Sequence, residues 1–229
     1  MNEIAERLSQ IRSRIATAAH AAGRPPESVR LIAVSKTKPA TDIRQAYAAG
    51  QRDFGENYVQ ELVLKAAELA DLPDLRVHFI GHLQRNKVKN VVAHAHMVHT
   101  VDSVRLAQEL EKRVPQAKAP FAVLVEVNVG GEAQKSGVAP DQVAAVLDAV
   151  DAAESLTLRG LMTVPPWSEE PGEARRYFDA LASLRDRVGG QARLPEMSMG
   201  MSADLEHAIA AGATYVRVGT AIFGERGAK

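Results

Sequence analysis

The sequence predicts an α/β protein: a single (β/α)8 barrel of the TIM type, preceded by an extra N-terminal helix. Three observations lead to this fold class. Eight short β-prone runs alternate with stretches of helical composition. Several runs are almost continuously apolar, such as LIAV and YVRV, as expected for parallel strands covered by helices. The turn after the first run, SKTKPAT, lacks the glycine-rich pattern of a doubly wound open sheet.

The first twenty or so residues predict an amphipathic helix that precedes the barrel. Ile4, Leu8, Ile11 and Ile15 recur at the spacing of one helical face. We therefore expect a helix over residues 1–22. No charge run, low-complexity tract or Pro/Ser-rich linker divides the rest of the sequence, so residues 1–229 are expected to form one domain.

Strands and helices are expected to alternate after this helix. The expected strands are Arg30–Ser35, Arg52–Gly55, Val77–Ile80, Met97–Val101, Ala122–Val127, Leu158–Val164, Glu196–Met199 and Tyr215–Val218. The helical stretches between them include Asp42–Ala49, Val59–Leu69, Ser103–Val114, Asp141–Ala153, Glu173–Val188 and Ala203–Ala210.

Composition narrows the class of partner. Apolar residues make up 46% and aromatic residues 4%, so the core, including the barrel interior, should be aliphatic. Lys plus Arg equals Asp plus Glu at 28 each, which gives no field to attract nucleic acid or an anionic membrane. A small molecule is the better candidate. The sequence has no cysteine, no signal-peptide pattern and no membrane-length apolar run, which favours the cytoplasm.

Lys36 is the first candidate for chemistry. Reactive groups in these barrels come from the carboxyl ends of the strands and the loops that follow them. Lys36 directly follows the apolar run LIAVS at the end of the first expected strand. Partial burial there would favour the neutral amine, which can attack an aldehyde. A solvated loop lysine is the alternative, and Lys36 alone does not exclude it.

The last two expected strands are followed by residues that suit a phosphate group, which such barrels often bind at this place. Ser198 offers a hydroxyl, and Gly200 would let backbone amides approach a ligand. Gly219 and Thr220 would open a short helix whose N–H groups and hydroxyl bind a phosphate. A tight turn followed by a helix cap is the alternative.

Arg217 lies two residues before Gly219 and should face the same side of the last strand. A buried arginine needs a partner. Two partners remain open from spacing alone: the ring nitrogen of a bound ligand, or a carboxylate such as Glu56 or Glu126 in a structural salt bridge.

Other polar residues carry weaker signals. His94, His96 and His99 cluster as HAHMVH, but they span a helix and a strand without a shared face, so we expect no metal site. Lys38 and Lys135 lie in expected loops. Solvation is the plain interpretation of both lysines, and a secondary docking point for a cofactor is the alternative.

Eight motifs together resemble one known family. The sequence resembles the pyridoxal phosphate homeostasis proteins over nearly its whole length, and these look like the barrel domain of alanine racemase, of pyridoxal phosphate fold type III. The motifs are AVSKTKP at 33–39, FGENYVQE at 54–61, HFIGHLQRNK at 78–87, HTVDS at 99–103, EVNVGGEAQKSG at 126–137, RGLMTVPP at 159–166, SMGMSADLEHAI and VRVGTAIFGER.

The resemblance implies a cofactor site for pyridoxal 5′-phosphate (PLP). It implies that Lys36 forms the internal aldimine, a reversible Schiff base, and that Arg217 lies near the pyridine nitrogen. Asn57 is carried over as a residue beside the cofactor. Phosphate-binding residues implied by the resemblance are Ser198, Gly219 and Thr220.

The resemblance also implies a carrier or regulator of the cofactor in vitamin B6 and amino-acid homeostasis, not an enzyme. Racemisation needs an acid/base group on each face of the substrate, and in the racemases the second is a tyrosine from an additional domain. Tyr47, Tyr58 and Tyr177 fall on expected helices or helix starts, and Tyr215 begins a strand at the opposite end of the barrel.

The expected protein is therefore a cytoplasmic monomer that delivers PLP to apo-enzymes. Two alternatives remain open at this point. One is a PLP-dependent amino-acid enzyme related to the racemases. The other is a phosphosugar-type barrel enzyme that uses Lys36 without any pyridoxal.

Overall fold

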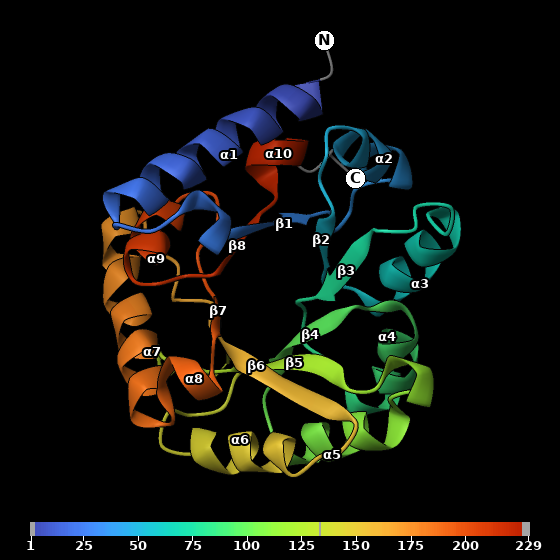
Figure 1. The fold of residues 1–229 in the computed structure, drawn as a ribbon, viewed down its shortest axis with the longest axis vertical. Helices are drawn as coiled ribbons and strands as arrows, with labels where there is room; N and C mark the ends of the chain where they lie inside the picture. The colour runs from blue at the N-terminus through green and yellow to red at the C-terminus, as the bar shows by residue number, and fades with distance from the viewer. Residues whose placement is uncertain (1–2, 133, 226–229) are drawn as a thin grey trace.

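The computed structural model describes residues 3–132 and 134–225, which form a closed barrel of eight parallel strands ringed by helices (Figure 1). Each strand pairs with the next along the chain, and β8 closes the barrel on β1. The predicted fold class is confirmed. The strands are β1 (Arg30–Val34), β2 (Asp53–Glu56), β3 (Arg76–Phe79), β4 (Met97–Val101), β5 (Phe121–Glu126), β6 (Leu156–Met162), β7 (Glu196–Ser198) and β8 (Tyr215–Val218).

Helices follow or precede each strand around the outside of the barrel. Four short 3-10 helices lie at Pro26–Ser28, Arg85–Lys87, Gln116–Lys118 and Pro171–Ala174. The α-helices are α1 (Glu3–Ala21), α2 (Ala40–Ala48), α3 (Val59–Glu68), α4 (Val88–His94), α5 (Val104–Arg113), α6 (Val143–Asp151), α7 (Arg175–Arg187), α8 (Gly190–Arg193), α9 (Leu205–Ala210) and α10 (Thr220–Phe223).

Helix α1 lies across α9 and α10, so the start of the chain covers its last elements (Figure 1). Its four predicted apolar residues, from Ile4 to Ile15, are all buried, because they form one face of the helix. Arg14 on this helix pairs with Glu206 of α9 at 2.7 Å. Residues 1 and 2 of the predicted helix, and residues 226–229 of the predicted domain, lie outside the described residues.

Strand β6 differs most from the sequence prediction. It begins at Leu156 and ends at Met162, whereas Leu158–Val164 was expected. The early start is explained by the pairing of Leu156 with Phe121 of β5. The early end fits the two prolines that follow Val164, since proline has no N–H to donate to a neighbouring strand.

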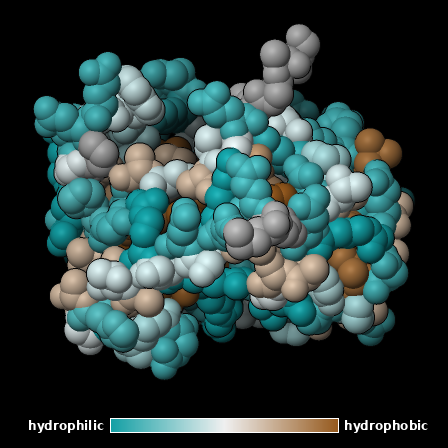
Figure 2. Space-filling view, turned by 90° about the horizontal axis from the view of Figure 1, so that it is seen from above, coloured by the Kyte–Doolittle hydropathy of each residue, from teal (hydrophilic) through white to brown (hydrophobic). Residues whose placement is uncertain are grey.

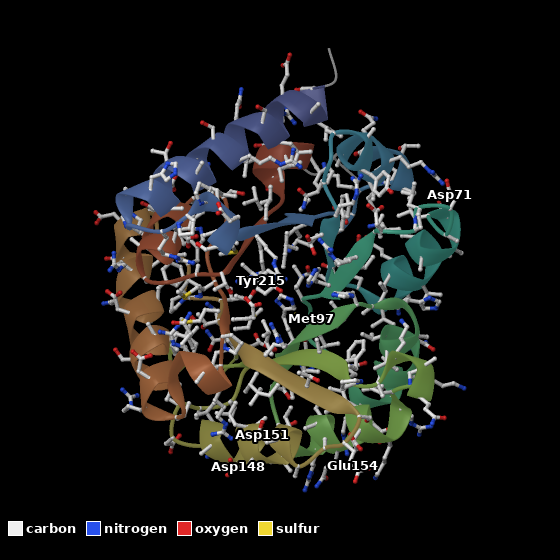
Figure 3. The ribbon with its side chains drawn as sticks, viewed as in Figure 1. Asp71, Met97, Asp148, Asp151, Glu154 and Tyr215 are labelled. Atoms are coloured by element: carbon white, nitrogen blue, oxygen red, sulfur yellow. The ribbon has the colours of Figure 1, made fainter. Side chains whose placement is uncertain are left out.

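The main hydrophobic core lies between the strands and the helices, but the barrel interior is not uniformly aliphatic. Met97, Leu124 and Met162 form a small apolar cluster of their own. Figure 3 shows Met97 and Tyr215 pointing into the middle of the ring. Buried polar groups also lie inside the barrel, so the expectation of an aliphatic interior was only partly right. They include Asp53, His78, His99, Ser198 and Arg217.

Polar residues cover most of the face shown in Figure 2, and apolar residues appear there as separate small patches. Trp167, in the loop after β6, is the most exposed of the large apolar side chains in the described part of the chain, at 82%. None of the described helices combines the length and the apolar character needed to cross a membrane.

Candidate functional site

A cavity of about 370 Å³ opens at the carboxyl ends of the strands. Five of the six predicted site residues line it together, although they are spread along the sequence. The residues that line the cavity are Val34, Lys36, Asn57, Ile80, Met162, Val164, Met201, Ser202, Ala203, Arg217, Gly219 and Thr220.

Three other hollows are of similar or larger volume, and one of about 420 Å³ lies between α1 and α9 beside Arg14 and Glu206. A second, of about 830 Å³, lies beside α5 and is lined by residues such as His82 and Arg105. The third, of about 350 Å³, lies at the amino ends of the strands near Arg30 and Arg76. None of them contains a predicted site residue. We assign the site to the cavity with Lys36, because reactive groups in these barrels gather at the carboxyl ends.

The backbone before Lys36 is held by a buried ion pair. The Lys65 ammonium, on α3, donates to the Ser35 carbonyl and to Glu56 Oε1, both at 2.7 Å. The Ser35 hydroxyl donates to the same Glu56 oxygen at 2.6 Å. Burial raises the pKa of Glu56, and Lys65 and Ser35 only partly offset it. The residue that precedes Lys36 is therefore fixed by a charged network behind the strand.

The backbone after Lys36 is held as well. The Thr37 N–H donates to Glu61 Oε2 at 2.7 Å, and that carboxylate also pairs with Lys65 at 2.8 Å. Thr37 has a φ of 64°, which is uncommon for a β-branched residue and costs on the order of 1–3 kcal/mol. Contacts on both flanks thus hold the main chain at Lys36 while its side chain reaches the cavity.

Asn57 brings an unsatisfied acceptor to the cavity. Its Oδ1 is buried and has no hydrogen-bond partner among the described residues. Its main chain packs on Gly81, where an added Cβ would lie 2.1 Å from the Asn57 carbonyl oxygen. Thr100 fixes Gly81 by donating its hydroxyl to the Gly81 carbonyl at 2.7 Å. A buried acceptor without a donor is costly, so Asn57 suits a ligand that donates a hydrogen bond.

Arg217 is buried and holds its charge without a salt bridge. Its two terminal nitrogens donate to Ser198 Oγ at 2.8 Å and to the Thr163 carbonyl at 2.9 Å. Within residues 3–132 and 134–225 it forms no ion pair, so the alternative partners Glu56 and Glu126 are not realised. Burial lowers the pKa of Arg217 to about 10, against the opposing charges of Asp204 and Glu126. It therefore remains a cation at neutral pH.

Ser198, which was predicted to bind a phosphate, is not among the residues that line the cavity, although it contacts Arg217, which is. It is the last residue of β7, it is fully buried, and its hydroxyl contacts Arg217 and His99 Nδ1 at 2.8 and 2.9 Å. Side chains alternate along a strand, and the alternation directs Ser198 into the barrel. Ser202, four residues later in the same motif, lines the cavity instead.

The start of α10 forms another part of the cavity wall. Gly219 precedes the first residue of this short helix, Thr220, as the sequence predicted, and both line the cavity. A Cβ at Gly219 would lie 3.3 Å from the Val34 carbonyl oxygen of β1. The glycine thus permits close packing of the two strand ends that carry Lys36 and the helix start.

The two loop lysines have local partners. Lys38 donates to the Glu225 carbonyl at 2.7 Å, and Lys135 donates to the Pro165 carbonyl at 3.0 Å and pairs with Glu132. Tyrosine is absent from the described residues that line the cavity. Tyr215, the first residue of β8, accepts a hydrogen bond from Arg30 at 2.8 Å.

The histidine cluster of the sequence is separated by the fold. His94 and His96 are exposed at the end of α4 and after it, whereas His99 is buried inside the barrel. In the described part of the chain, three or more metal-ligating side chains do not gather into a group that could hold an ion.

Comparisons with known proteins decide the family. The family model for the alanine racemase N-terminal domain matches residues 7–227. A pyridoxal phosphate homeostasis protein of Pseudomonas aeruginosa is 50% identical, over 99% of this chain and 97% of its own. The chain belongs to this family. The Escherichia coli K12 homeostasis protein is 45% identical over 99% of this chain and 98% of its own, so the resemblance seen in the motifs is confirmed.

Solved structures of the homeostasis family agree with the fold. PipY of Synechococcus elongatus, 42% identical, superimposes with a TM-score of 0.86 without PLP and 0.83 with PLP bound. Both comparisons cover 96% of this chain and 100% of PipY. An alanine racemase of Corynebacterium glutamicum, 20% identical, has a TM-score of 0.69 over 99% of this chain and 63% of its own. The racemase therefore shares the barrel fold.

Proposed function

We propose that this homeostasis-family chain binds PLP as a reversible Schiff base on Lys36 and serves the cellular supply of the cofactor, with effects on amino-acid metabolism. One observation carries the proposal: Lys36, Arg217 and the Gly219–Thr220 helix start line one cavity at the carboxyl end of the barrel. The PipY structure with PLP bound, in a relative of the same family, supports it.

The residues present fit the cofactor. Gly219 and Thr220 offer a helix start and a hydroxyl for the phosphate, and Ser202 adds a second hydroxyl at the cavity wall. The Asn57 oxygen lacks a donor, which a polar ligand would supply. The Arg217 cation would donate to the ring nitrogen and keep it unprotonated, since an arginine does not accept a proton from the ring.

Lys36 supplies the amine for covalent capture. When bound, the cofactor supplies an aldehyde that condenses with a primary amine and releases water, and hydrolysis reverses the step. The Ser35 and Thr37 contacts hold the main chain on either side of Lys36, so the side chain alone needs to move when the bond forms or breaks.

A carrier role is favoured over catalysis. Turnover of an amino acid by proton exchange needs two acid/base groups on opposite faces. Lys36 is one such group, and the described residues lining the cavity include no tyrosine for the other. A racemase-like enzyme is the alternative. Incubation of PLP-loaded protein with L-amino acids in D2O should give no α-deuterated product, and steady exchange would establish the enzyme instead.

The decisive experiment compares visible absorption spectra of the protein with PLP for wild type, Lys36→Ala and Lys38→Ala. Lys38 is the matched control, since it lies two residues from Lys36 and its ammonium donates a hydrogen bond to the Glu225 carbonyl instead of lining the cavity. The wild type and Lys38→Ala should show a visible band that borohydride removes. Mass spectrometry should then find the reduced pyridoxyl group on the peptide that contains Lys36. A band that survives in Lys36→Ala overturns the assignment, and no band in any protein overturns PLP binding.

We also propose a cytoplasmic monomer that hands PLP to apo-enzymes and binds neither nucleic acid nor membranes. The balance of 28 basic and 28 acidic residues supports this, because it leaves no strong net field. Light scattering should give a mass near 24.7 kDa. The PLP-loaded protein should restore the activity of a PLP-dependent apo-enzyme faster than the same amount of PLP that has been released from the protein and separated from it by dialysis. Equal rates of reactivation would contradict delivery.

A further inference from the structure

A chain of four buried hydrogen bonds crosses the barrel interior from its amino end to the cavity. Asp53 Oδ1 lies 2.9 Å from His78 Nε2, and His78 Nδ1 lies 2.9 Å from His99 Nε2. His99 Nδ1 lies 2.9 Å from Ser198 Oγ, which accepts from Arg217 Nη1 at 2.8 Å. Asp53 on β2 is thereby connected to a residue of the cavity wall on β8.

The ionised carboxylate of Asp53 sets the donor-to-acceptor direction of this chain of hydrogen bonds. Burial alone would raise the pKa of Asp53, but hydrogen bonds from His78 and Arg76 hold that pKa well below its usual range. Asp53 therefore only accepts, so His78 must donate from Nε2. When His78 carries a single proton, its Nδ1 is an acceptor, and His99 donates to it from Nε2.

The same reasoning reaches Arg217. His99 Nδ1 has no proton in this arrangement, so it accepts from the Ser198 hydroxyl. Ser198 in turn accepts from the guanidinium, which can only donate. Complete burial holds the pKa of His99 well below its usual value, which keeps this ring neutral. Every donor in the chain has one acceptor, and no alternative direction satisfies all four bonds with a neutral His78.

We propose that His78 and His99 are positioning residues: through Ser198 they hold the Arg217 guanidinium so that its remaining N–H groups face the ring nitrogen of the bound cofactor. The proposal rests on the proposed function. Arg217 has no carboxylate partner among residues 3–132 and 134–225, so neutral contacts from Ser198 and Thr163 set its orientation. Loss of the chain behind Ser198 would free that hydroxyl to rotate and the guanidinium to turn away.

The first test uses ligand-free protein and reads the histidine tautomers by ¹⁵N–¹H NMR of the imidazole rings. His78 and His99 should each carry a proton on Nε2 and none on Nδ1. Asp53→Asn should abolish this preference at His78, because an amide can donate as well as accept. A proton on Nδ1 of His99 in the wild type overturns the inferred direction of these hydrogen bonds, whether or not the protein binds PLP.

The second test compares the binding of PLP with that of its 1-deaza analogue, in which carbon replaces the ring nitrogen. His99→Leu should weaken PLP binding about tenfold, as loss of one well-placed hydrogen bond to a charged group predicts, and leave the affinity for the analogue unchanged. His99→Gln, which keeps a donor and an acceptor, should recover most of the PLP affinity.

The control is His96→Leu, because His96 is exposed and lies outside the chain although its ring centroid is 5.7 Å from that of His78. It should leave both affinities unchanged. Equal weakening of PLP and analogue binding by His99→Leu means that His99 is only structural, and overturns the positioning role.

Failure of the wild type to bind PLP refutes the proposed function separately, because the NMR result stands without ligand. If His99→Leu does not fold, Ser198→Ala, which breaks the chain at the next bond, takes its place in the same comparison.

Discussion

Glu126 should make the folded protein less stable as the pH rises, and the size of this effect follows from its surroundings. This carboxyl at the end of β5 is 7% exposed, and its Oε2 has no hydrogen-bond partner in the described residues. Burial, reinforced by the charge of Asp102, raises the pKa of Glu126 from 4.5 to about 7, against the opposing charge of Arg217.

The direction of the pH effect on stability follows from comparing the pKa of Glu126 in the folded and unfolded protein. The folded pKa lies above the unfolded one, so the folded state binds the Glu126 proton more tightly. The associated stability is fully present below about pH 4.5 and is lost as the pH rises through about 7. Each pKa unit corresponds to about 1.4 kcal/mol, so the shift amounts to about 3 kcal/mol well above pH 7. Between pH 5 and pH 8 the loss is about 2.5 kcal/mol.

The assay is urea unfolding at pH 5 and pH 8 of the wild type, Glu126→Gln and the exposed control Glu154→Gln. A neutral amide cannot titrate, so Glu126→Gln should lack this loss, and its stability relative to the wild type should rise by about 2.5 kcal/mol between the two pH values. Glu154→Gln should follow the wild type, and all three should share one m-value. Parallel pH dependences of the wild type and Glu126→Gln would refute the reasoning.

Three further outcomes are expected. Gly81→Ala should weaken PLP binding at least tenfold, because the new Cβ would displace the Asn57 carbonyl 2.1 Å away; an unchanged dissociation constant would show that the strand ends adjust freely. Lys65→Met should cost about 3–5 kcal/mol in urea unfolding at pH 8, since it leaves the Glu56 charge buried, and clearly less at pH 4, where Glu56 takes up a proton. The same cost at both pH values would argue against a charged Glu56. Phe178→Ala, in the fully buried face of α7, should cost about 3–5 kcal/mol, and a loss below about 1 kcal/mol would contradict its packing.

Local sequence patterns predicted the fold and most of the cavity. Eight apolar runs alternating with helical stretches predicted the barrel, because each run had to be buried by the helix that follows it. Lys36 and Gly219 were found because each directly follows such a run, and the strand ends of a barrel share one face. These positions depend only on where a strand stops.

Which face a side chain takes was harder to predict. Ser198 is the last residue of β7 and is buried in the interior, whereas Ser202 lies in the segment after this strand and lines the cavity. The sequence motif offered both hydroxyls without showing where β7 ends. The chain through His78 and His99 was missed, because nothing local shows that different strands direct polar groups to one point. A single polar residue inside an apolar strand, as in VHF, VHT and VRV, was the available signal.

The closure of β8 on β1 places the site at the seam between the two ends of the chain (Figure 1). Lys36 follows the first strand, whereas Arg217 and Thr220 belong to the last strand and helix. On the ribosome Lys36 emerges long before Arg217 and Thr220, and the slow pairing of such distant strands must precede formation of the cavity. A nascent chain that still lacks β8 therefore has no cavity around Lys36, so the proposed capture of PLP would depend on synthesis and closure of the whole barrel.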